Sequence, residues 1–264
     1  MTASHDLLEL AVDIAREAGE LAARRREAGV SIAATKSAIA DIVTEADREV
    51  EDLIRRRIAD ARPDDGFLGE ESGAGESRSG ITWVVDPIDG TVNYAYGIPA
   101  YAVSIAVVEG PPEPGEWTAL AGVVFNPVSG ELFRASRGEG AWLGDRRLAV
   151  NDPVSAAGAL LATGFGYDPA THAGDLARLA KVMPLARDIR RMGAASLDLA
   201  SVAAGRLDGY FERGLHPWDH AAGALLVQEA DGLVGGIGGA PVGRAMTIAA
   251  GPDLFARLVS VIRE

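Results

Sequence analysis

The chain of 264 residues contains no cysteine. Disulfide bonds, thiolate metal ligands and a cysteine nucleophile are therefore excluded. Lysine is also scarce, because only Lys36 and Lys181 occur among the 25 basic residues. The four histidines never stand in a His-Glu-x-x-His arrangement, so a zinc hydrolase is not favoured, although His216 and His220 flank an aspartate.

Long apolar runs and excess positive charge are lacking too. No run approaches the roughly 18 apolar residues of a spanning helix. Asp6 and Glu9 lie where a secretory signal would need an apolar core. The net charge of −13 disfavours nucleic acid and anionic membranes as partners. We therefore expect a cytoplasmic protein with neither kind of partner.

Several common site motifs are missing. The glycine-rich segment 235–243 does not fit G-x-G-x-x-G and is not followed by a Walker lysine, so we interpret it as loops around a short strand. The serine hydrolase motif G-x-S-x-G and the calcium-loop pattern D-x-D-x-D-G are absent. The length and the apolar content of 48% suit one large or two modest globular domains.

The most informative stretch is Trp83 to Asn93, which reads W-V-V-D-P-I-D-G-T-V-N. It begins as a β-favouring apolar strand and then breaks at Pro87 and at the Asp89-Gly90 pair. A strand ending here delivers two carboxylates and a backbone carbonyl to one corner, which suits a hard divalent cation. Free N–H groups just beyond the corner could hold an anion. A surface turn would explain the dipeptides alone, but the preceding strand and the other acidic clusters favour a site.

Three motifs in order carry a resemblance to a known family. The sequence D-P-I-D-G-T-V-N at 86–93 resembles the central signature of the inositol monophosphatase family of Mg²⁺-dependent, lithium-sensitive phosphatases. G-E-E-S at 69–72 and W-D-H-A-A-G at 218–223 are similar to its two flanking signatures. The resemblance extends over about residues 5 to 260. One departure is Asp231, which replaces a glycine that usually ends a helix in the family; aspartate tolerates left-handed geometry better than most residues.

The first part of the chain predicts two helices and several strands. Apolar periodicity indicates amphipathic helices over 5–28 and 44–60, the second with a Thr44–Asp47 capping box. A loop or hairpin is expected over 30–43 and a flexible polar connection over 72–80. Short alternating segments separated by tight turns then predict strands of an antiparallel meander at 101–109, 118–125 and 131–135, with 142–150 closing this half.

Beyond a possible domain boundary at 151–153, strands and helices alternate, which argues for layered α/β structure. Strands are expected at 159–163, 188–192, 209–212 and 246–250, and helices at 171–185, 196–204, 217–230 and 254–262. The fold class is therefore mixed α/β, and the resemblance implies an αβαβα layered sandwich. We expect an N-terminal α+β domain, 1–150, with most metal ligands. A C-terminal α/β domain, 151–264, would supply Asp219 and substrate-lining residues.

The resemblance also implies a metal site. Glu70, Asp86 and the Ile88 carbonyl would hold one ion, and Asp86, Asp89 and Asp219 a second. Because all these ligands are oxygens, Mg²⁺ is expected, two or three ions per subunit, with Mn²⁺ as a substitute. Glu70 read alone would be a solvated acidic loop residue, and Asp219 a favourable charge at a helix start.

Catalytic and substrate roles follow from the same resemblance. Glu70 and the Thr91–Asp47 pair would activate a water molecule, and N–H groups of Gly90 and Thr91 would hold the phosphate. Further residues are implied in substrate binding, Ala195 and Glu212, and as accessory groups, Lys36 and Glu71. Simpler roles remain open at this stage: a helix cap for Asp47, an exposed strand-end acid for Glu212 and an ordinary surface lysine for Lys36.

The expected function is hydrolysis of a phosphate monoester of a polyol similar to inositol 1-phosphate, by a homodimer. Histidinol phosphate, fructose 1,6-bisphosphate and 3′-phosphoadenosine nucleotides are alternative substrates within the family. A regulatory binding protein that works in a transcription complex is an alternative of another class. The presence of every expected ligand favours the enzyme.

Overall fold

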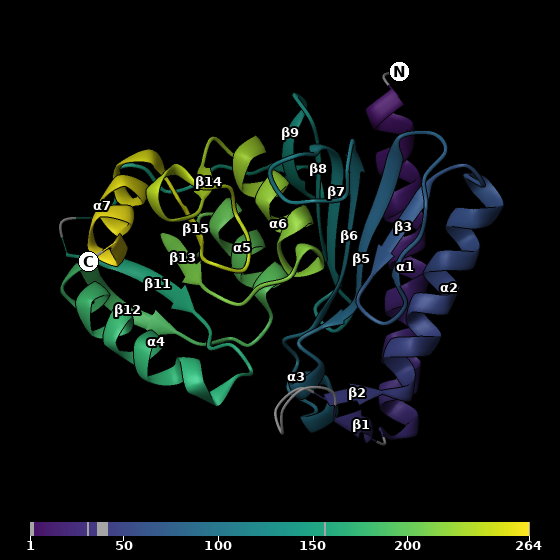
Figure 1. Ribbon diagram of the computed structural model, residues 1–264, viewed down its shortest axis with the longest axis horizontal. Helices are drawn as coiled ribbons and strands as arrows, with labels where there is room; N and C mark the ends of the chain where they lie inside the picture. The colour runs from purple at the N-terminus through teal and green to yellow at the C-terminus, as the bar shows by residue number, and fades with distance from the viewer. Residues whose placement is uncertain (1–2, 31, 36–41, 156, 264) are drawn as a thin grey trace.

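The computed structural model describes residues 3–30, 32–35, 42–155 and 157–263, and it shows five alternating layers (Figure 1). The α-helices within these residues are α1 (Ala3–Ala28), α2 (Glu45–Ala61), α3 (Thr91–Tyr96), α4 (Pro169–Val182), α5 (Ala195–Ala203), α6 (Pro217–Glu229) and α7 (Pro252–Arg263). Two 3₁₀ segments are η1 (Met183–Leu185) and η2 (Ile237–Gly239). Helices α1 and α2 form one outer layer, α5 and α6 the central layer, and α4 and α7 the other outer layer.

Between the outer layer of α1 and α2 and the central helices lies a sheet of eight strands. Its strands are β3 (Gly66–Gly69), β4 (Gly73–Ala74), β5 (Ile81–Asp89), β6 (Ala102–Glu109), β7 (Thr118–Asn126), β8 (Glu131–Ser136), β9 (Gly140–Leu143) and β10 (Arg146–Arg147). The order is β10-β9-β8-β7-β6-β5-β3-β4. Neighbours from β5 to β10 pair antiparallel, so the predicted meander is confirmed, while β3 runs parallel to β5.

The second sheet lies between the central helices and the layer of α4 and α7. It contains β11 (Ala159–Thr163), β12 (Ala186–Arg190), β13 (Gly209–Glu212), β14 (Leu233–Gly235) and β15 (Thr247–Ala250), in the order β12-β11-β13-β15-β14. The predicted αβαβα layering is confirmed. The two sheets fall on either side of residues 151–153, and the division into two separate domains stays a prediction.

Alternating side chains on the large sheet make two hydrophobic cores. Along β5, Trp83 and Val85 pack with the buried stripe of α1 and α2, whereas Val84 faces the central helices. Period-two alternation places successive residues on opposite faces of a strand. A sheet that is apolar on both faces must be covered on both, and the helices on either side meet that need.

The predicted elements match the structure to within a few residues. Helix α1 starts two residues before the predicted 5–28, and α2 begins after its Thr44 cap as predicted. The unpredicted parts include strands β3, β4 and β14 and the short helix α3, whereas β1 (Ile32–Thr35) pairs antiparallel with β2 (Ile42–Thr44), in agreement with the hairpin alternative for 30–43. Asp231 has φ 65°, so it does adopt the left-handed conformation expected of the residue in place of glycine.

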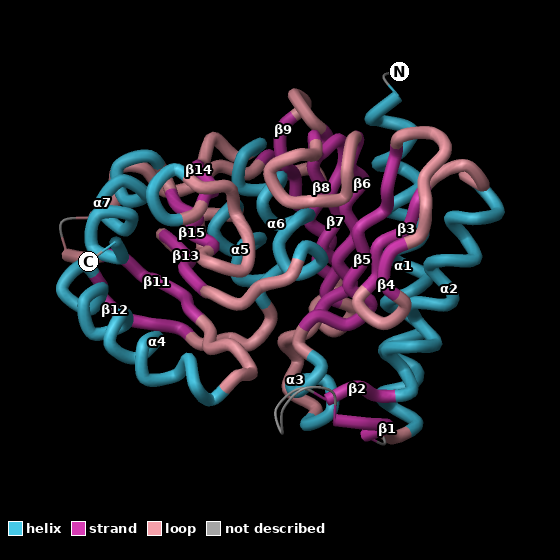
Figure 2. The backbone as a smooth tube through the Cα atoms, viewed as in Figure 1, coloured by secondary structure: helices cyan, strands magenta, loops and turns pink. Residues whose placement is uncertain are grey.

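The β1–β2 pair lies beside α3 (Figure 2). The described strands of the segment 30–43, which was predicted as a loop or hairpin over a site, thus lie next to the end of the central motif. Lys36 lies outside the described residues. Among the described residues no helix has the length and apolar character needed to cross a bilayer.

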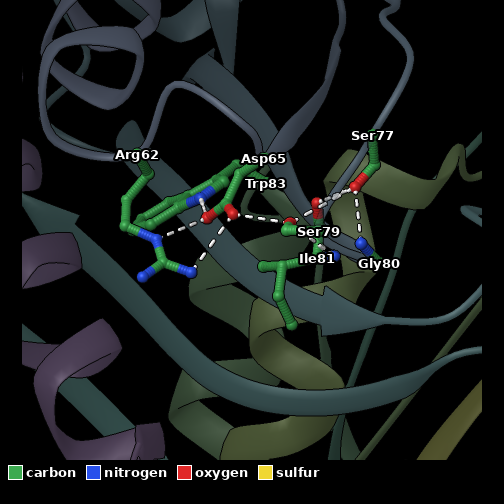
Figure 3. Close-up of polar contacts among 7 residues, drawn as sticks. All are labelled: Arg62, Asp65, Ser77, Ser79, Gly80, Ile81 and Trp83. Carbon is green, nitrogen blue, oxygen red and sulfur yellow. Dashed lines mark hydrogen bonds and ion pairs between the residues drawn. The ribbon is translucent and has the colours of Figure 1, made fainter.

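The connection predicted to be flexible is hydrogen-bonded back to the start of β5 (Figure 3). The Asp65 carboxylate accepts bonds from the Trp83 indole at 3.0 Å, from Arg62 at 2.9 Å and from the Ser79 hydroxyl at 2.7 Å. Ser77 donates from its hydroxyl to the Ile81 carbonyl at 2.8 Å. In this connection, hydrogen bonds from serine side chains take the place of hydrogen bonds between strands. The polar residues therefore hold the connection in a defined conformation.

Candidate active site

The central motif forms a bulge at the end of β5. Asp86 pairs with Ser104 and Asp89 with Ala102, so three steps along β5 match two along β6. Residues three apart in a regular strand point to opposite faces, and the one extra residue brings both carboxylates to the same side. Pro87 lies inside the bulge, where it does not have to donate to a ladder. The predicted corner is therefore present.

This corner opens into a cleft of about 1010 Å³. Nine of the predicted site residues line it: Glu70, Asp86, Ile88, Asp89, Gly90, Thr91, Ala195, Glu212 and Asp219. They come from the turn after β3, from β5, from the start of α3, and from α5, β13 and α6, and they span both sheets. Glu70 and Asp219, which lie 149 residues apart in the sequence, thus reach the same cleft as Asp86.

Asp219 enters the cleft from the first turn of α6. Pro217 occupies the first turn, where its missing N–H is not needed. The Asp219 carboxylate accepts a bond from the His216 N–H at 2.7 Å, so it also caps its own helix. Capping and a role in the cleft are compatible, because a cap carboxylate stands at the open end of the helix.

Burial, reinforced by repulsion between carboxylates, determines the electrostatics of the cleft. Burial raises the pKa of Asp86 well above its ordinary value, and the carboxylate of Glu70 raises it further. Burial likewise raises the pKa of Asp219, again with Glu70 as the next cause. The pKa of Asp89 rises to about 6 because it is buried, although bonds from Ser196 partly offset the effect. Carboxylates arranged this way are stabilised by positive charge between them.

The donor set fits a hard divalent cation. All the candidate ligands are carboxylate or carbonyl oxygens, which suit Mg²⁺ rather than zinc. Within the described part of the chain, no three acidic or histidine side chains are close enough to form a finished metal site. Carboxylates that repel one another do not approach to coordination distance without a cation between them. The side chains therefore fit a divalent cation through their oxygen donors and because they face the same cleft.

Asp47 and Thr91 meet as the family resemblance implies. The Thr91 hydroxyl donates to Asp47 Oδ1 at 3.2 Å or to the Ile88 carbonyl at 3.1 Å; one hydroxyl hydrogen serves only one acceptor at a time. Asp47 also completes the capping box, accepting from the Thr44 N–H at 2.8 Å. Burial raises the pKa of Asp47 to about 6. It is therefore both a cap and a partner of Thr91.

Gly90 turns the chain from β5 into α3. Its φ is 89°, and an added Cβ would lie 2.9 Å from the Ala100 carbonyl oxygen and 3.1 Å from that of Gly193. Both the left-handed conformation and the close approach require glycine. Asn93 fixes the turn on the other side, donating to the carbonyls of Ala100 at 2.7 Å and Met192 at 2.8 Å. The short turn thus joins the two sheets at the cleft.

Helix α5 holds Asp89 from the opposite side of the cleft. Asp89 accepts from the Ala195 N–H at 3.3 Å, the Ser196 N–H at 2.7 Å and the Ser196 hydroxyl at 2.5 Å. The contribution of Ala195 is thus a backbone donor. Sequence reasoning missed Ser196, since a serine in the first turn of a helix carries no sign of a partner 107 positions away.

Glu212 reaches the cleft from the end of β13. It accepts a bond from the Tyr210 hydroxyl at 2.6 Å, and burial raises its pKa to about 7. An added Cβ at Gly164 would lie 2.0 Å from its carboxylate, so the chain passes directly against it. Glu212 is therefore a largely enclosed carboxylate and not an exposed strand-end acid.

Behind Glu212 lies Asp198, which sequence reasoning also missed. Its side chain is buried, and its Oδ1 atom has no hydrogen-bond partner among the described residues. Burial, then the charge of Glu212, raises the pKa of Asp198 to about 8, while the Arg191 guanidinium lowers it. Burial therefore favours the protonated form of Asp198 at neutral pH.

The outer wall carries aromatic and basic side chains. His216 stacks on Trp218 with ring centroids 4.8 Å apart and planes within 2°. Arg244 donates to His216 Nε2 at 3.0 Å, which requires a lone pair on that nitrogen. Glu71 lies beside the cleft and contributes negative charge near Asp47. His220 is fully buried and burial lowers its pKa to about 4, so it is a neutral core residue.

Carboxylates gathered between two sheets, beside a glycine turn at the end of a strand, are typical of enzymes that handle phosphate groups with the help of metal ions. The chain belongs to the inositol monophosphatase family, whose model matches residues 4–263. It is a phosphatase of that family, which is metal-dependent.

Similar proteins carry two kinds of name. The inositol-1-monophosphatase of Mycobacterium leprae is 41% identical over 255 residues, covering 90% of this chain and 83% of that protein. The Nus factor SuhB of Escherichia coli K12 is 42% identical over 233 residues, covering 87% and 85%. The crystal structure of the extragenic suppressor protein suhB from Bartonella henselae matches with a TM-score of 0.88 and 37% identity, covering 98% of this chain and 99% of that one.

Proposed function

We propose that this phosphatase is Mg²⁺-dependent and hydrolyses phosphate monoesters of polyols similar to inositol 1-phosphate. The observation that carries the proposal is the convergence of Glu70, Asp86, Asp89 and Asp219 from separate elements on one cleft. Bringing four carboxylates together costs several kcal/mol at an effective dielectric of about 20, unless cations compensate.

The proposed ion-binding groups are five: Glu70, Asp86, the Ile88 carbonyl, Asp89 and Asp219. Bound Mg²⁺, with Mn²⁺ as a substitute, would supply positive charge to the phosphate oxygens and polarise the attacking water. Side chains and backbone groups of the protein would orient the water and bind the substrate.

Asp47 and Thr91 orient the nucleophilic water. The Asp47 carboxylate, ionised at neutral pH since its pKa is about 6, accepts the Thr91 hydrogen at 3.2 Å. The lone pairs of the Thr91 oxygen are then available to a water hydrogen. Glu70 accepts a proton from the same water as the water oxygen attacks phosphorus; the ester P–O bond breaks, and the leaving alkoxide takes a proton from solvent water. The N–H groups of Gly90 and Thr91 hold the phosphate oxygens beside it.

The alcohol half of the substrate lies toward α5 and β13. Glu212, fixed by the Tyr210 hydroxyl, accepts hydrogen bonds from the hydroxyls of a polyol, and the wall at Ala195 borders them. A carboxylate acceptor favours a polyol over a leaving group that lacks hydroxyl donors. Glu71 and Lys36 are accessory groups in this proposal.

The test is phosphate release from a small panel of esters. Inositol 1-phosphate, histidinol phosphate, fructose 1,6-bisphosphate and a 3′-phosphoadenosine nucleotide are compared with Mg²⁺, and again with lithium. We expect the highest kcat/KM on the inositol ester, dependence on Mg²⁺ and inhibition by lithium. Glu212→Gln should lower kcat/KM on the polyol more than on the nucleotide. A higher kcat/KM on another ester would reject the polyol assignment.

A second candidate is a regulatory role in a transcription complex. The observation that favours it is the name of several relatives, Nus factor SuhB. Capture of an RNA-polymerase assembly by this chain, with no phosphate release from the panel, would support regulation as the sole role. The assembled acidic cleft favours the enzyme.

The remaining proposals concern the whole protein. We propose a homodimer of two-domain subunits, located in the cytoplasm, with two or three Mg²⁺ ions per subunit. Light scattering measures the oligomeric state, and metal analysis of the purified protein measures the number of bound Mg²⁺ ions.

A further inference from the structure

Helix α2 presents a second buried carboxylate one turn beyond Asp47. Glu51 is 2% exposed and Asp47 is 1% exposed. Residues four apart share one face of a helix, so both buried side chains point from α2 toward the large sheet. A buried carboxylate without a donor is strongly unfavourable, so the partner of Glu51 indicates what it does.

That partner is the turn that carries Glu70. The Glu51 Oε2 atom accepts the backbone N–H of Glu71 at 2.9 Å. The N–H of Glu70 donates to the Val85 carbonyl at 3.3 Å, one residue before Asp86 on β5. The turn after β3 is therefore held between α2 on one side and β5 on the other, with the Glu70 side chain reaching the cleft from between these anchors.

Gly69 shows how closely the turn approaches Glu51. An added Cβ would lie 2.5 Å from Glu51 Oε2 and 2.5 Å from the Phe67 ring. Gly69 is not among the glycines with positive φ. The residue is therefore small because the chain passes over the carboxylate, and a larger side chain would push the turn away from α2.

We propose that Glu51 is a positioning residue for cation binding: its carboxylate holds the Gly69–Glu71 turn so that Glu70 faces Asp86. The inference rests on the proposed function, which makes Glu70 a ligand. Groups that orient metal ligands without touching the ion typically change metal affinity by about 10–100-fold when removed. A charged acceptor also makes a hydrogen bond roughly twice as strong as a neutral one. Loss of Glu51 should therefore weaken cation binding as well as the fold.

The experiment measures Mn²⁺ binding to the substrate-free full chain by electron paramagnetic resonance, so it does not depend on turnover. Glu51→Ala should weaken Mn²⁺ affinity by about tenfold or more. Glu51→Gln keeps the shape and a neutral acceptor, and should weaken it by a smaller factor. Asp52→Asn is the matched control, because the neighbouring Asp52 carries the same charge on the exposed side of α2 and should bind as the wild type does.

Gly69→Ala tests the same contact from the turn and should also weaken Mn²⁺ binding. Circular dichroism and thermal unfolding identify folded variants; if Glu51→Ala does not fold, Glu51→Gln and Gly69→Ala decide. Unchanged Mn²⁺ affinity in these two folded variants would overturn the inference and leave Glu51 a purely structural residue. A wild-type chain that does not bind Mn²⁺ would instead refute the proposed function.

Discussion

At the scale of single residues, Asp89 shows how tightly the site is defined. Its carboxylate accepts three hydrogen bonds from the start of α5 and shares the cleft with Asp86. These donors fix the orientation of the carboxylate. Because all three donors are neutral groups, they do not cancel the negative charge of Asp89, which remains available to a cation in the cleft.

Asp89→Asn should abolish measurable turnover. The amide keeps the size of the side chain and can still accept from α5, but it removes one negative ligand. Since loss of an orienting partner alone costs about 10–100-fold, loss of a ligand should cost more than about a hundredfold. Phosphate release measures the effect, with Ser196→Ala as a graded control expected to lose about tenfold. Near-normal turnover in Asp89→Asn would refute the metal assignment.

Asp198 predicts a pH dependence of stability. Burial raises its folded pKa to about 8, far above the ordinary value for aspartate, so the folded state retains a proton that the unfolded chain releases. The stability tied to that proton is full below the unfolded pKa and is lost as the pH rises through about 8. In metal-free protein, Asp198→Asn should therefore raise Tm relative to wild type in alkaline buffer and have little effect in acid. A Tm difference that is the same at every pH would contradict this.

At the scale of elements, the Asp65 cluster joins the 72–80 connection to β5 (Figure 3). Hydrogen bonds from Arg62, Ser79 and Trp83 lower the pKa of Asp65 although burial opposes them. The Trp83 ring is fully buried, and its N–H group has this carboxylate as acceptor.

Asp65→Ala should destabilise the fold by about 2 kcal/mol, because it leaves a buried indole N–H without an acceptor. Urea unfolding measures the change in the free energy of unfolding. Asp64→Asn is the control, since the Asp64–Arg78 pair is exposed and such pairs contribute at most about 1 kcal/mol. Equal losses in the two variants would show that the Asp65 cluster contributes no more than a surface pair.

Elements differed in how well they could be predicted. Helix α2 was evident from its periodicity and cap, and β6, β7 and β8 from alternation between turns, because these signals are local. Strand β14 has three residues, and its hydrogen bonds come from β15, which follows it along the chain. Such a short strand is stabilised by its pairing with β15, and its own three residues carry little pattern from which a strand could be predicted.

At the scale of the whole molecule, the layers place a cleft between two sheets that each supply acidic side chains. Asp86 and Asp89 come from the large sheet, while Glu212 comes from the small one, and Asp219 from the helix between them. Cation binding should therefore stabilise the complete fold and not one half of it.

Mg²⁺ should raise the Tm of metal-free protein. A ligand that binds only the folded state stabilises it by about 2.7 kcal/mol at a hundred times its Kd. The increase should be larger in mildly alkaline buffer than in acid, because the raised pKa values of Asp47, Asp89 and Glu212 leave these carboxyls protonated in acid. Calorimetry with K⁺ at equal ionic strength is the control. An equal shift with K⁺ would mean that no specific cation site exists.

The sequence by itself determined what depends on neighbours along the chain: the strand and break at 83–93, the Thr44–Asp47 cap and the first turn of α6. The order of the layers was implied by the family resemblance. The sequence also pointed to the residues that meet in the cleft, through motifs that resemble a family. Only the tertiary structure decided which distant groups support them. Ser196 on Asp89, Tyr210 on Glu212 and Glu51 under the Glu70 turn are joined by packing of separate elements, and no local pattern of residues records a contact made across the fold.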